Sequence, residues 1–312
     1  MNMNIVFMGT PGFAIPCFEA LYHEGYQISA VVTQPDKPKG RGKKLMEPEV
    51  KTIAKEMGIK IYQPNKIKEP NFIERLKSLK PDLIVVVAFG QILTKDILDL
   101  PTHGCINVHA SLLPKLRGAA PINWSIINGD KVTGITIMYM DTGLDTGDII
   151  LQKSINIGEE ETAGELHDRL AILGSKALID TTKLLHSGKI VRTKQNHNEA
   201  NYAPMLTKEI GKIDWSMDAV KIKNLIRGTY PWPGAYSFYE GKMFKIFTVE
   251  VTDNDIINDD WGKICEVNKE YITIKCKKGF LRIKELQFQN NKRMTVGSYL
   301  RGHEILEGKR LS

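Results

Sequence analysis

The sequence of 312 residues contains only four cysteines, and no two of them form a C-x-x-C pair. They lie far apart along the chain, at Cys17, Cys105, Cys265 and Cys276. This spacing is typical of neither a zinc site nor a disulfide framework. We therefore predict that no metal is bound and that the protein works in the reducing cytoplasm.

Long apolar runs are also missing. No stretch approaches the roughly 20 apolar residues that a membrane span needs, so we expect no membrane partner. The first residues, MNMNIVFMGTPGF, lack the basic and long apolar regions of a signal peptide and are predicted to form the first core strand. The net charge of +7 weakly favours a polyanionic partner, although solubility alone explains it too.

Three nucleotide-binding or catalytic signatures are absent as well. The sequence contains neither the G-x-G-x-x-G fingerprint nor the P-loop G-x-x-x-x-G-K-[ST], which disfavours a nicotinamide or ATP enzyme. The G-x-S-x-G elbow is missing too, so a Ser-His-Asp hydrolase built on Ser111 is a weak hypothesis. The GTPGF stretch at 9–13 fits a ligand-binding loop about as well as a plain tight turn.

What the first part of the chain does contain is an alternation of strand-like and helix-like segments. Short apolar segments occur at 4–9, 27–32, 59–62, 82–89, 105–109, 133–140 and 148–155. Segments with helical spacing lie between several of them, and a long helix is expected at 162–186. Strands that are apolar on both faces are typical of a parallel sheet covered on both sides. We predict a Rossmann-like, doubly wound, mostly parallel sheet in an α/β domain over residues 1–188.

The pattern changes after Gly188. Residues 189–208 are polar and lack a clear period, which predicts a linker. From 209 to 312, about five short strand-like segments separated by turns predict a small β-barrel of the oligonucleotide-binding (OB-like) type. Its scattered cations are expected to contact phosphates: Arg227, Lys242, Lys245, Lys277, Lys278, Lys292 and Arg293.

A basic loop, QPDKPKGRGKKLMEP, occupies residues 34–48. Its proline and glycine content excludes a regular helix or a central strand. A solvated surface loop explains such a run, and so does a contact with a phosphate backbone near the carboxyl ends of the strands. Both interpretations stay open on the residues alone.

Polar side chains are concentrated in two further places. In CINVH, Asn107 and His109 are two residues apart, so an extended chain places them on the same side. A lone buried His is usually structural. An amide and an imidazole together, however, suit the oxyanion of an acyl transfer. The stretch MDTGLDTGDII offers Asp141, Asp145 and Asp148 either as turn formers or as a carboxylate beside the imidazole, and spacing does not choose among them.

Taken together, these motifs resemble the 10-formyltetrahydrofolate-dependent formyltransferases. The shared stretches run in the family's order over residues 5–290: GTPGFA, QPDKPKGRGKK, AFGQIL, INVHASLLPKLRGAAPI, MDTGLDTGDI, IDWS and PWPGA. The combination N-V-H-x-S-L-L-P with L-D-T-G-D is specific to that superfamily. The basic loop, IDWS and PWPGA resemble its tRNA-modifying branch.

The resemblance implies 10-formyltetrahydrofolate as donor and initiator methionyl-tRNA as acceptor. It implies Asn107, His109 and Asp145 as the catalytic trio, and the choice of Asp145 rests on the resemblance alone. The implied folate contacts are Ser111, Leu112, Leu113, Pro114, Phe89, Gly90, Ile92 and Leu93. The implied tRNA contacts are Arg41, Lys43 and Lys44.

Two alternatives remain at this stage. One is a formyltransferase that acts on an amino sugar nucleotide or on a glycinamide ribonucleotide, which has no evident need of the basic loop or the second domain. The other is a non-catalytic RNA-binding protein, which would bind tRNA without depending on Asn107 or His109. We also expect a monomer.

Overall fold

The computed structural model describes residues 3–39, 44–252 and 260–312. The chain forms two compact units. The first comprises Met1–Pro121, Val132–Asn156 and His167–Ala203, and the second comprises Ile122–Lys131, Ile157–Leu166 and Pro204–Ser312. The domain boundaries expected near residues 188 and 209 stay a prediction.

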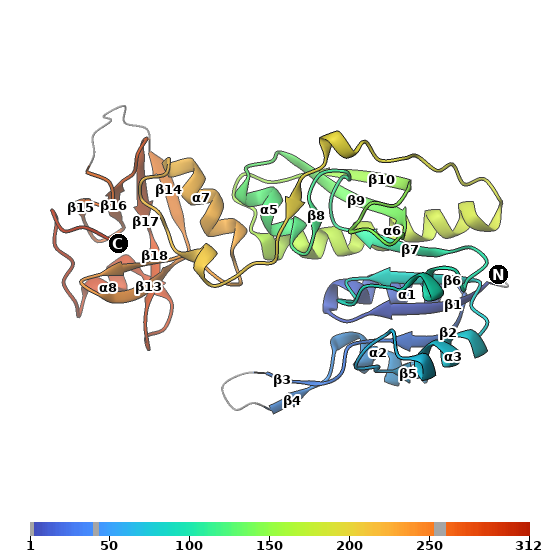
Figure 1. The fold of residues 1–312 in the computed structure, drawn as a ribbon. Coiled ribbons are helices and arrows are strands. Elements are labelled where there is room, and N and C mark those ends of the chain that lie inside the picture. The colour runs from blue at the N-terminus through green and yellow to red at the C-terminus, as the bar shows by residue number, and fades with distance from the viewer. Residues whose placement is uncertain (1–2, 40–43, 253–259) are drawn as a thin grey trace. The chain divides into compact units, whose positions relative to one another are not determined.

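The first unit is built on one seven-stranded sheet in the order β10-β9-β7-β6-β1-β2-β5 (Figure 1). Its strands are β1 (Asn4–Gly9), β2 (Gln27–Val32), β5 (Ile61–Tyr62), β6 (Leu83–Val87), β7 (Cys105–His109), β9 (Val132–Tyr139) and β10 (Ile149–Asn156). From β5 to β7 every neighbouring pair is parallel, whereas β9 is antiparallel to β7 and to β10. The predicted mostly parallel α/β sheet is therefore confirmed.

Helices cover both faces of this sheet. They are α1 (Ile15–His23), α2 (Glu49–Glu56), α3 (Pro70–Ser78), α4 (Lys95–Leu98) and the part of α6 (Ala163–His186) from His167 on, whereas α5 (Pro121–Ile127) belongs to the second unit from Ile122 on. Leu76 of α3 and Ile97 of α4 share one core cluster with Ile84 of β6. Gly174 of α6 instead approaches Val108 of β7 on the other face. No helix in the described residues, α6 included, is both long and apolar enough to cross a membrane.

The carboxyl end of β1 is the switch point of the sheet. The chain moves outward from β1 in both directions, through β2 to β5 and through β6 to β7. In such sheets ligands bind in the crevice where the direction reverses. The loops after β1, β2 and β6 meet there, because Thr10 Oγ1 and Gln34 Nε2 both donate to the carbonyl of Phe89, at 3.0 and 3.2 Å.

Two small ribbons accompany the main sheet. The flanks of the basic loop form an antiparallel pair, β3 (Lys37–Lys39) with β4 (Lys44–Met46). In the stretch predicted as a linker, β11 (Tyr202–Ala203) runs parallel to β8 (Arg117–Gly118), which follows β7 in the chain. A polar stretch without periodicity is thus bonded to the segment that follows His109.

The second unit is rich in β-structure. Its strands are β12 (Tyr236–Tyr239), β13 (Lys242–Ile246), β14 (Val249–Thr252), β15 (Ile264–Val267), β16 (Ile272–Lys275), β17 (Phe280–Ile283), β18 (Glu285–Phe288) and β19 (Met294–Thr295), and its helices include α7 (Ala219–Gly228) and α8 (Val296–Leu300). They form two four-stranded antiparallel sheets, β12-β13-β18-β19 and β14-β17-β16-β15. These sheets confirm the β-rich second domain that was predicted, while its OB-like barrel type stays a prediction.

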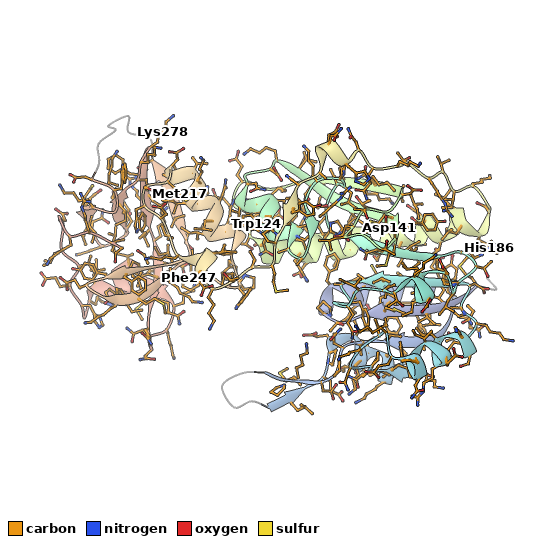
Figure 2. The ribbon with its side chains drawn as sticks, viewed as in Figure 1. Trp124, Asp141, His186, Met217, Phe247 and Lys278 are labelled. Carbon is orange, nitrogen blue, oxygen red and sulfur yellow. The ribbon has the colours of Figure 1, made fainter. Side chains whose placement is uncertain are left out.

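The expected count of about five strands was too low for a physical reason. MFKIFTVEV (243–251) and FLRIKELQF (280–288) each have the pattern of one strand. Each bends instead and contributes to both sheets, the first as β13 and β14 and the second as β17 and β18, as corner strands do. The bends face each other: Phe247, labelled in Figure 2, donates its N–H to Glu285 O at 3.1 Å. Lys284 donates its N–H to Thr248 O at 2.9 Å.

One of the predicted phosphate contacts is wrong. Arg227, in α7, is buried. Its Nη1 donates to the carbonyls of Gly158 and Glu161, both at 3.0 Å, and its Nε donates to Asn224 Oδ1 at 2.9 Å. The guanidinium therefore joins segments inside the second unit and does not face a phosphate in solvent.

Candidate active site

The carboxyl end of β7 carries the two polar residues of CINVH. β7 pairs with β6 on one side and β9 on the other, with Asn107 opposite Met138 and His109 opposite Thr136. Val108, between them, points to the face that α6 covers. Asn107 and His109 therefore share the opposite face, beside the loop that follows β6.

The side-chain amide of Asn107 has no hydrogen-bond partner among the described residues. The residue is half-buried, and its amide makes no hydrogen bond with any other described residue. Asn107 is also absent from the buried side-chain polar atoms that lack a partner, so the amide is accessible to solvent. An accessible amide without a protein partner at the end of a central strand is suited to bind a ligand oxygen.

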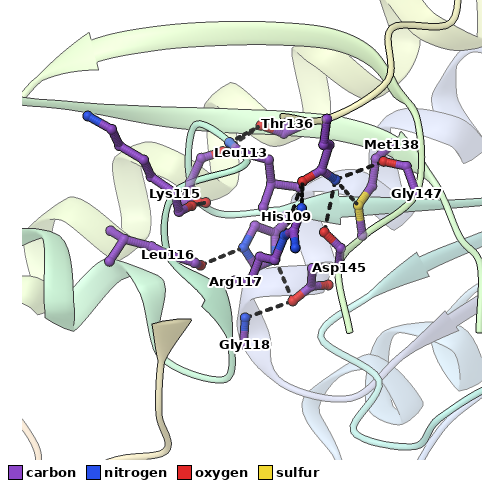
Figure 3. A network of polar contacts seen from close by, with 12 residues as sticks. His109, Leu113, Lys115, Leu116, Arg117, Gly118, Thr136, Met138, Asp145 and Gly147 are labelled. Carbon is purple, nitrogen blue, oxygen red and sulfur yellow. Dashed lines mark hydrogen bonds and ion pairs between the residues drawn. The ribbon is translucent and has the colours of Figure 1, made fainter. Parts of the chain in front are cut away.

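His109 is 6% exposed and has a different partner at each ring nitrogen (Figure 3). Nε2 lies 3.0 Å from the carbonyl of Leu116, which can only accept, so Nε2 carries a proton. Nδ1 faces Asp145 Oδ2 at 3.7 Å, longer than a hydrogen bond but within ion-pair range. Nδ1 is therefore the nitrogen that can gain or lose a proton beside a carboxylate.

The structure distinguishes Asp145 from Asp141 in MDTGLDTGDII. Asp141, on the loop labelled in Figure 2, accepts from Gly143 N at 3.0 Å and from Thr146 Oγ1 at 2.7 Å, so it shapes the turn. Asp145 is the one whose carboxylate faces His109, and its Oδ2 also accepts from Gly118 N at 2.8 Å. Gly147 must be glycine, because a Cβ there would lie 1.9 Å from the carbonyl oxygen of Tyr139.

The segment Ser111–Pro114 makes a tight turn beside β9. Ser111 is buried, and its Oγ donates to Lys115 O at 2.6 Å. Thr136 Oγ1 donates to Ser111 O at 2.7 Å and accepts from Leu113 N at 3.1 Å. The Ser111 hydroxyl is thus bonded to the backbone, which argues further against a nucleophile. Leu112 and Pro114 are half-buried.

The four residues of the loop after β6 that the resemblance implied as folate contacts divide into two pairs. Phe89 and Leu93 are buried in the core of the first unit. Gly90 and Ile92 are exposed, with Ile92 at 80%. Of these four residues, Ile92 is the one with an exposed side chain, while Phe89 contributes its carbonyl to the switch point.

Of the basic loop, Arg41 and Lys43 lie outside the described residues, as does the side chain of Lys44. The root of the β3–β4 hairpin is described. Lys51 Nζ contacts Asp36 Oδ2 at 2.7 Å and Glu47 Oε1 at 3.0 Å, and these two carboxylates precede β3 and follow β4. Hydrogen bonds from Lys51 and Gln63 hold the pKa of Asp36 below its ordinary value.

Two buried residues at the site were missed at the sequence level. Gln195 is 6% exposed and Arg117 is 2% exposed, and their side chains are bonded to each other. Gln195 also donates to the backbone of the loop that carries Asp145. No pattern could have found Gln195, since it lies in a polar stretch with no period.

No group of three or more His, Cys, Asp and Glu side chains in the described residues is placed to hold a metal ion.

Comparisons with known proteins agree with this arrangement. Residues 3–182 match the family model described as formyl transferase, and residues 205–304 match the formyl transferase C-terminal domain. A methionyl-tRNA formyltransferase of Alkaliphilus oremlandii is 54% identical over 306 residues, which cover 98% of this chain and 98% of that protein. One from Acetivibrio thermocellus is 51% identical over 307 residues, covering 98% and 99%.

Among solved structures, an N-formyltransferase from Helicobacter canadensis, in complex with folinic acid and dTDP-3-aminofucose, has a similar fold. Its TM-score is 0.66 at 20% identity, over 93% of this chain and 100% of that chain. Two family models together span most of the sequence, and both curated relatives exceed 50% identity over nearly the full length. The chain therefore belongs to the methionyl-tRNA formyltransferase family.

Proposed function

We propose that the protein transfers the formyl group of 10-formyltetrahydrofolate to the α-amino group of initiator methionyl-tRNA, giving N-formylmethionyl-tRNA for translation initiation. The observation that carries this proposal is the cluster of Asn107, His109 and Asp145 at the carboxyl edge of the sheet, in a chain 54% identical to a methionyl-tRNA formyltransferase. Work in the cytoplasm and as a monomer stay predictions from the sequence.

Asn107 is proposed to bind the formyl oxygen. When the neutral amine of the methionyl ester adds to the formyl carbon, that oxygen gains negative charge. An amide N–H placed where the charge develops stabilises it most, because little reorganisation is then needed. The free amide of Asn107 supports this role, and a protonated His109 on the same face of β7 would add a positive charge.

His109 and Asp145 are proposed to assist the transfer of a proton from the attacking amine to N10 of the folate. The new bond joins the amine nitrogen to the formyl carbon, the bond from that carbon to N10 breaks, and a proton must pass from the amine to N10. Because Nε2 of His109 is bonded to Leu116 O, Nδ1 is the nitrogen available for exchange. Asp145, facing Nδ1, stabilises the imidazolium and assists the transfer through water.

The donor is proposed to bind along the switch point, between the loop after β6 and the turn at residues 111–114. This is the crevice where doubly wound sheets bind ligands. The exposed apolar side chain of Ile92 and the open backbone of Gly90 fit the flat pterin ring. The buried Phe89 and Leu93 are proposed to support that surface from below.

The acceptor tRNA is proposed to contact Arg41, Lys43 and Lys44 of the basic hairpin. Such cations bind phosphates and position a nucleic acid without reading its sequence. Lys51 pairs with Asp36 before β3 and with Glu47 after β4, and these ion pairs fix the two ends from which the hairpin extends.

The test is to supply the protein with 10-formyltetrahydrofolate and methionyl-tRNA and to measure formylmethionyl-tRNA. Loss of one oxyanion donor costs about 10² to 10³ in turnover, so Asn107→Ala should lower kcat by that factor. Thermal unfolding of the same variant should match the parent protein. A near-normal kcat in folded Asn107→Ala would remove Asn107 from the mechanism. Formyl transfer to an amino sugar nucleotide, with none to methionyl-tRNA, would decide for the rival enzyme.

A further inference from the structure

Gln195 lies in the polar stretch after α6, yet its side chain is buried among backbone groups of the candidate site. Its Nε2 donates to Asp145 O at 2.9 Å and to Gly147 O at 2.8 Å. Its Oε1 accepts from Arg117 Nε at 3.1 Å and Nη2 at 2.7 Å. The amide therefore uses both N–H donors and its oxygen at once.

Together with one backbone hydrogen bond, these bonds form a closed cycle that includes the Asp145 carboxylate. Gln195 is bonded to the backbone of Asp145 on one side and to Arg117 on the other. Gly118, directly after Arg117, donates its N–H to Asp145 Oδ2 at 2.8 Å. Gln195 thus ties the loop that carries the carboxylate to the strand whose N–H binds it.

Asp145 needs such a tie for two reasons. Its φ is +54°, in the left-handed region that few residues other than glycine adopt; Asp tolerates it better than most, and neighbouring contacts help to hold it. Its Oδ2 is 3.7 Å from His109 Nδ1, which is too far for a hydrogen bond, so His109 does not itself align the carboxylate. The alignment comes from Gly118 and from the backbone that Gln195 holds.

We infer that Gln195 is a positioning residue for formyl transfer: it holds the Asp145 carboxylate against His109 so that the proton moves along a fixed path. The inference rests on the proposed function, because it requires Asp145 to act in the reaction. An amide is needed at this position. A carboxylate would still accept from Arg117 but would face two carbonyl oxygens, and an apolar side chain would bond to neither side.

The path of the polar stretch does not depend on Gln195 alone. Asn201 Oδ1 accepts from Leu116 N, and β11 pairs with β8. Removing the Gln195 amide should therefore free the Asp145 loop while the rest of the stretch remains in place. This separates positioning of Asp145 from general folding.

The experiment compares Gln195→Glu and Gln195→Met with the parent protein. A misplacement of about 1 Å can cost about 10²-fold in rate, so we expect kcat to fall about 10- to 100-fold in both variants, with KM for folate and tRNA unchanged. Amide hydrogen exchange of residues 143–148 should become faster, which reports loss of the tie without relying on activity. Asn196→Ala is the matched control, because among the described residues the Asn196 side chain bonds within its own turn.

A double mutant identifies the residue through which Gln195 acts. If it acts through Asp145, adding Gln195→Met to Asp145→Asn should lower kcat little further than Asp145→Asn alone. Full additivity, or normal kcat and exchange in both Gln195 variants, would overturn the inference. If Asp145→Asn itself has normal kcat, the proposed role of Asp145 fails and the inference fails with it. Impaired Asp145→Asn with normal Gln195 variants would refute the inference alone.

Discussion

Two regions of the first unit hold their charged groups in opposite ways. His109 is buried and Asp145 half-buried, and both are contacted mainly by uncharged groups. The carbonyl of Leu116 bonds His109, the N–H of Gly118 bonds the Asp145 carboxylate, and the amide of Gln195 bonds the Asp145 backbone. The root of the basic hairpin is held by charge. There Lys51 joins Asp36 and Glu47, whose side chains are 21% and 38% exposed.

The difference predicts different responses to solvent. Partly exposed ion pairs weaken as salt rises, because mobile ions screen them. Buried or partly buried hydrogen bonds in which at least one partner is uncharged are screened much less. The geometry around Asp145 should therefore be constant over a wide range of ionic strength, whereas the hairpin root should loosen as salt increases. Such insensitivity to salt is what the proton transfer proposed for this site requires.

The largest effect is expected from Asp145→Asn. The amide oxygen can still accept from Gly118 N, but the negative charge beside His109 is lost. Acid–base assistance contributes about 10² to 10⁴ in rate, so kcat should fall within that range while the unfolding midpoint changes little. The measurement is single-turnover formylation with both substrates saturating.

Asp141→Asn is the matched control for this prediction. Its oxygen can keep the turn bonds to Gly143 N and Thr146 Oγ1, and it does not face His109. We expect a near-normal kcat. Equal losses in the two variants would mean that the loop needs its overall charge and that Asp145 has no special pairing.

A smaller effect is expected from Lys51→Met, which removes the ion pairs at the hairpin root. KM for methionyl-tRNA should rise about two- to fivefold at low salt, because this factor corresponds to the free energy that one partly exposed ion pair typically contributes. Neither kcat nor KM for the folate should change. Steady-state kinetics over a salt series measures this, and the difference from the parent protein should shrink as salt rises.

Lys55→Met is the control for the hairpin root. Lys55 contacts Glu47 but not Asp36, and half of its side chain is exposed, so its loss should change KM for tRNA less. An equal rise of KM for both substrates in Lys51→Met would show that Lys51 acts on the donor site and not on the hairpin.

The smallest effect concerns pH. Hydrogen bonds from Lys51 and then Gln63 lower the pKa of Asp36 below its ordinary value of 3.8. A lowered folded-state pKa stabilises the fold above the unfolded value, and this contribution is lost as pH falls through the folded value. Asp36→Asn should therefore lose less stability than the parent between about pH 6 and about pH 3. Urea unfolding at both pH values tests this, and identical losses would disprove the contribution.

Much of the architecture could be predicted from local sequence. The alternation of apolar and helical segments identified the α/β sheet, and the period of two in CINVH placed Asn107 and His109 on one side of a strand. Strand counting failed in the second unit because a bend at Phe247 is not visible as a break in hydrophobicity. The burial of Arg227 was also missed, since its carbonyl partners lie far away in the sequence.

The sequence by itself determined which residue types meet at the end of β7, because a strand alternates its side chains whatever surrounds it. Only the tertiary structure decided which aspartate faces His109. That choice depends on a left-handed backbone at Asp145, on Gly118 N, and on an amide at Gln195 that lies 50 residues further along the chain. Contacts over such separations leave no periodic trace in a sequence, since they follow from how the chain packs and not from the repeat of any one element.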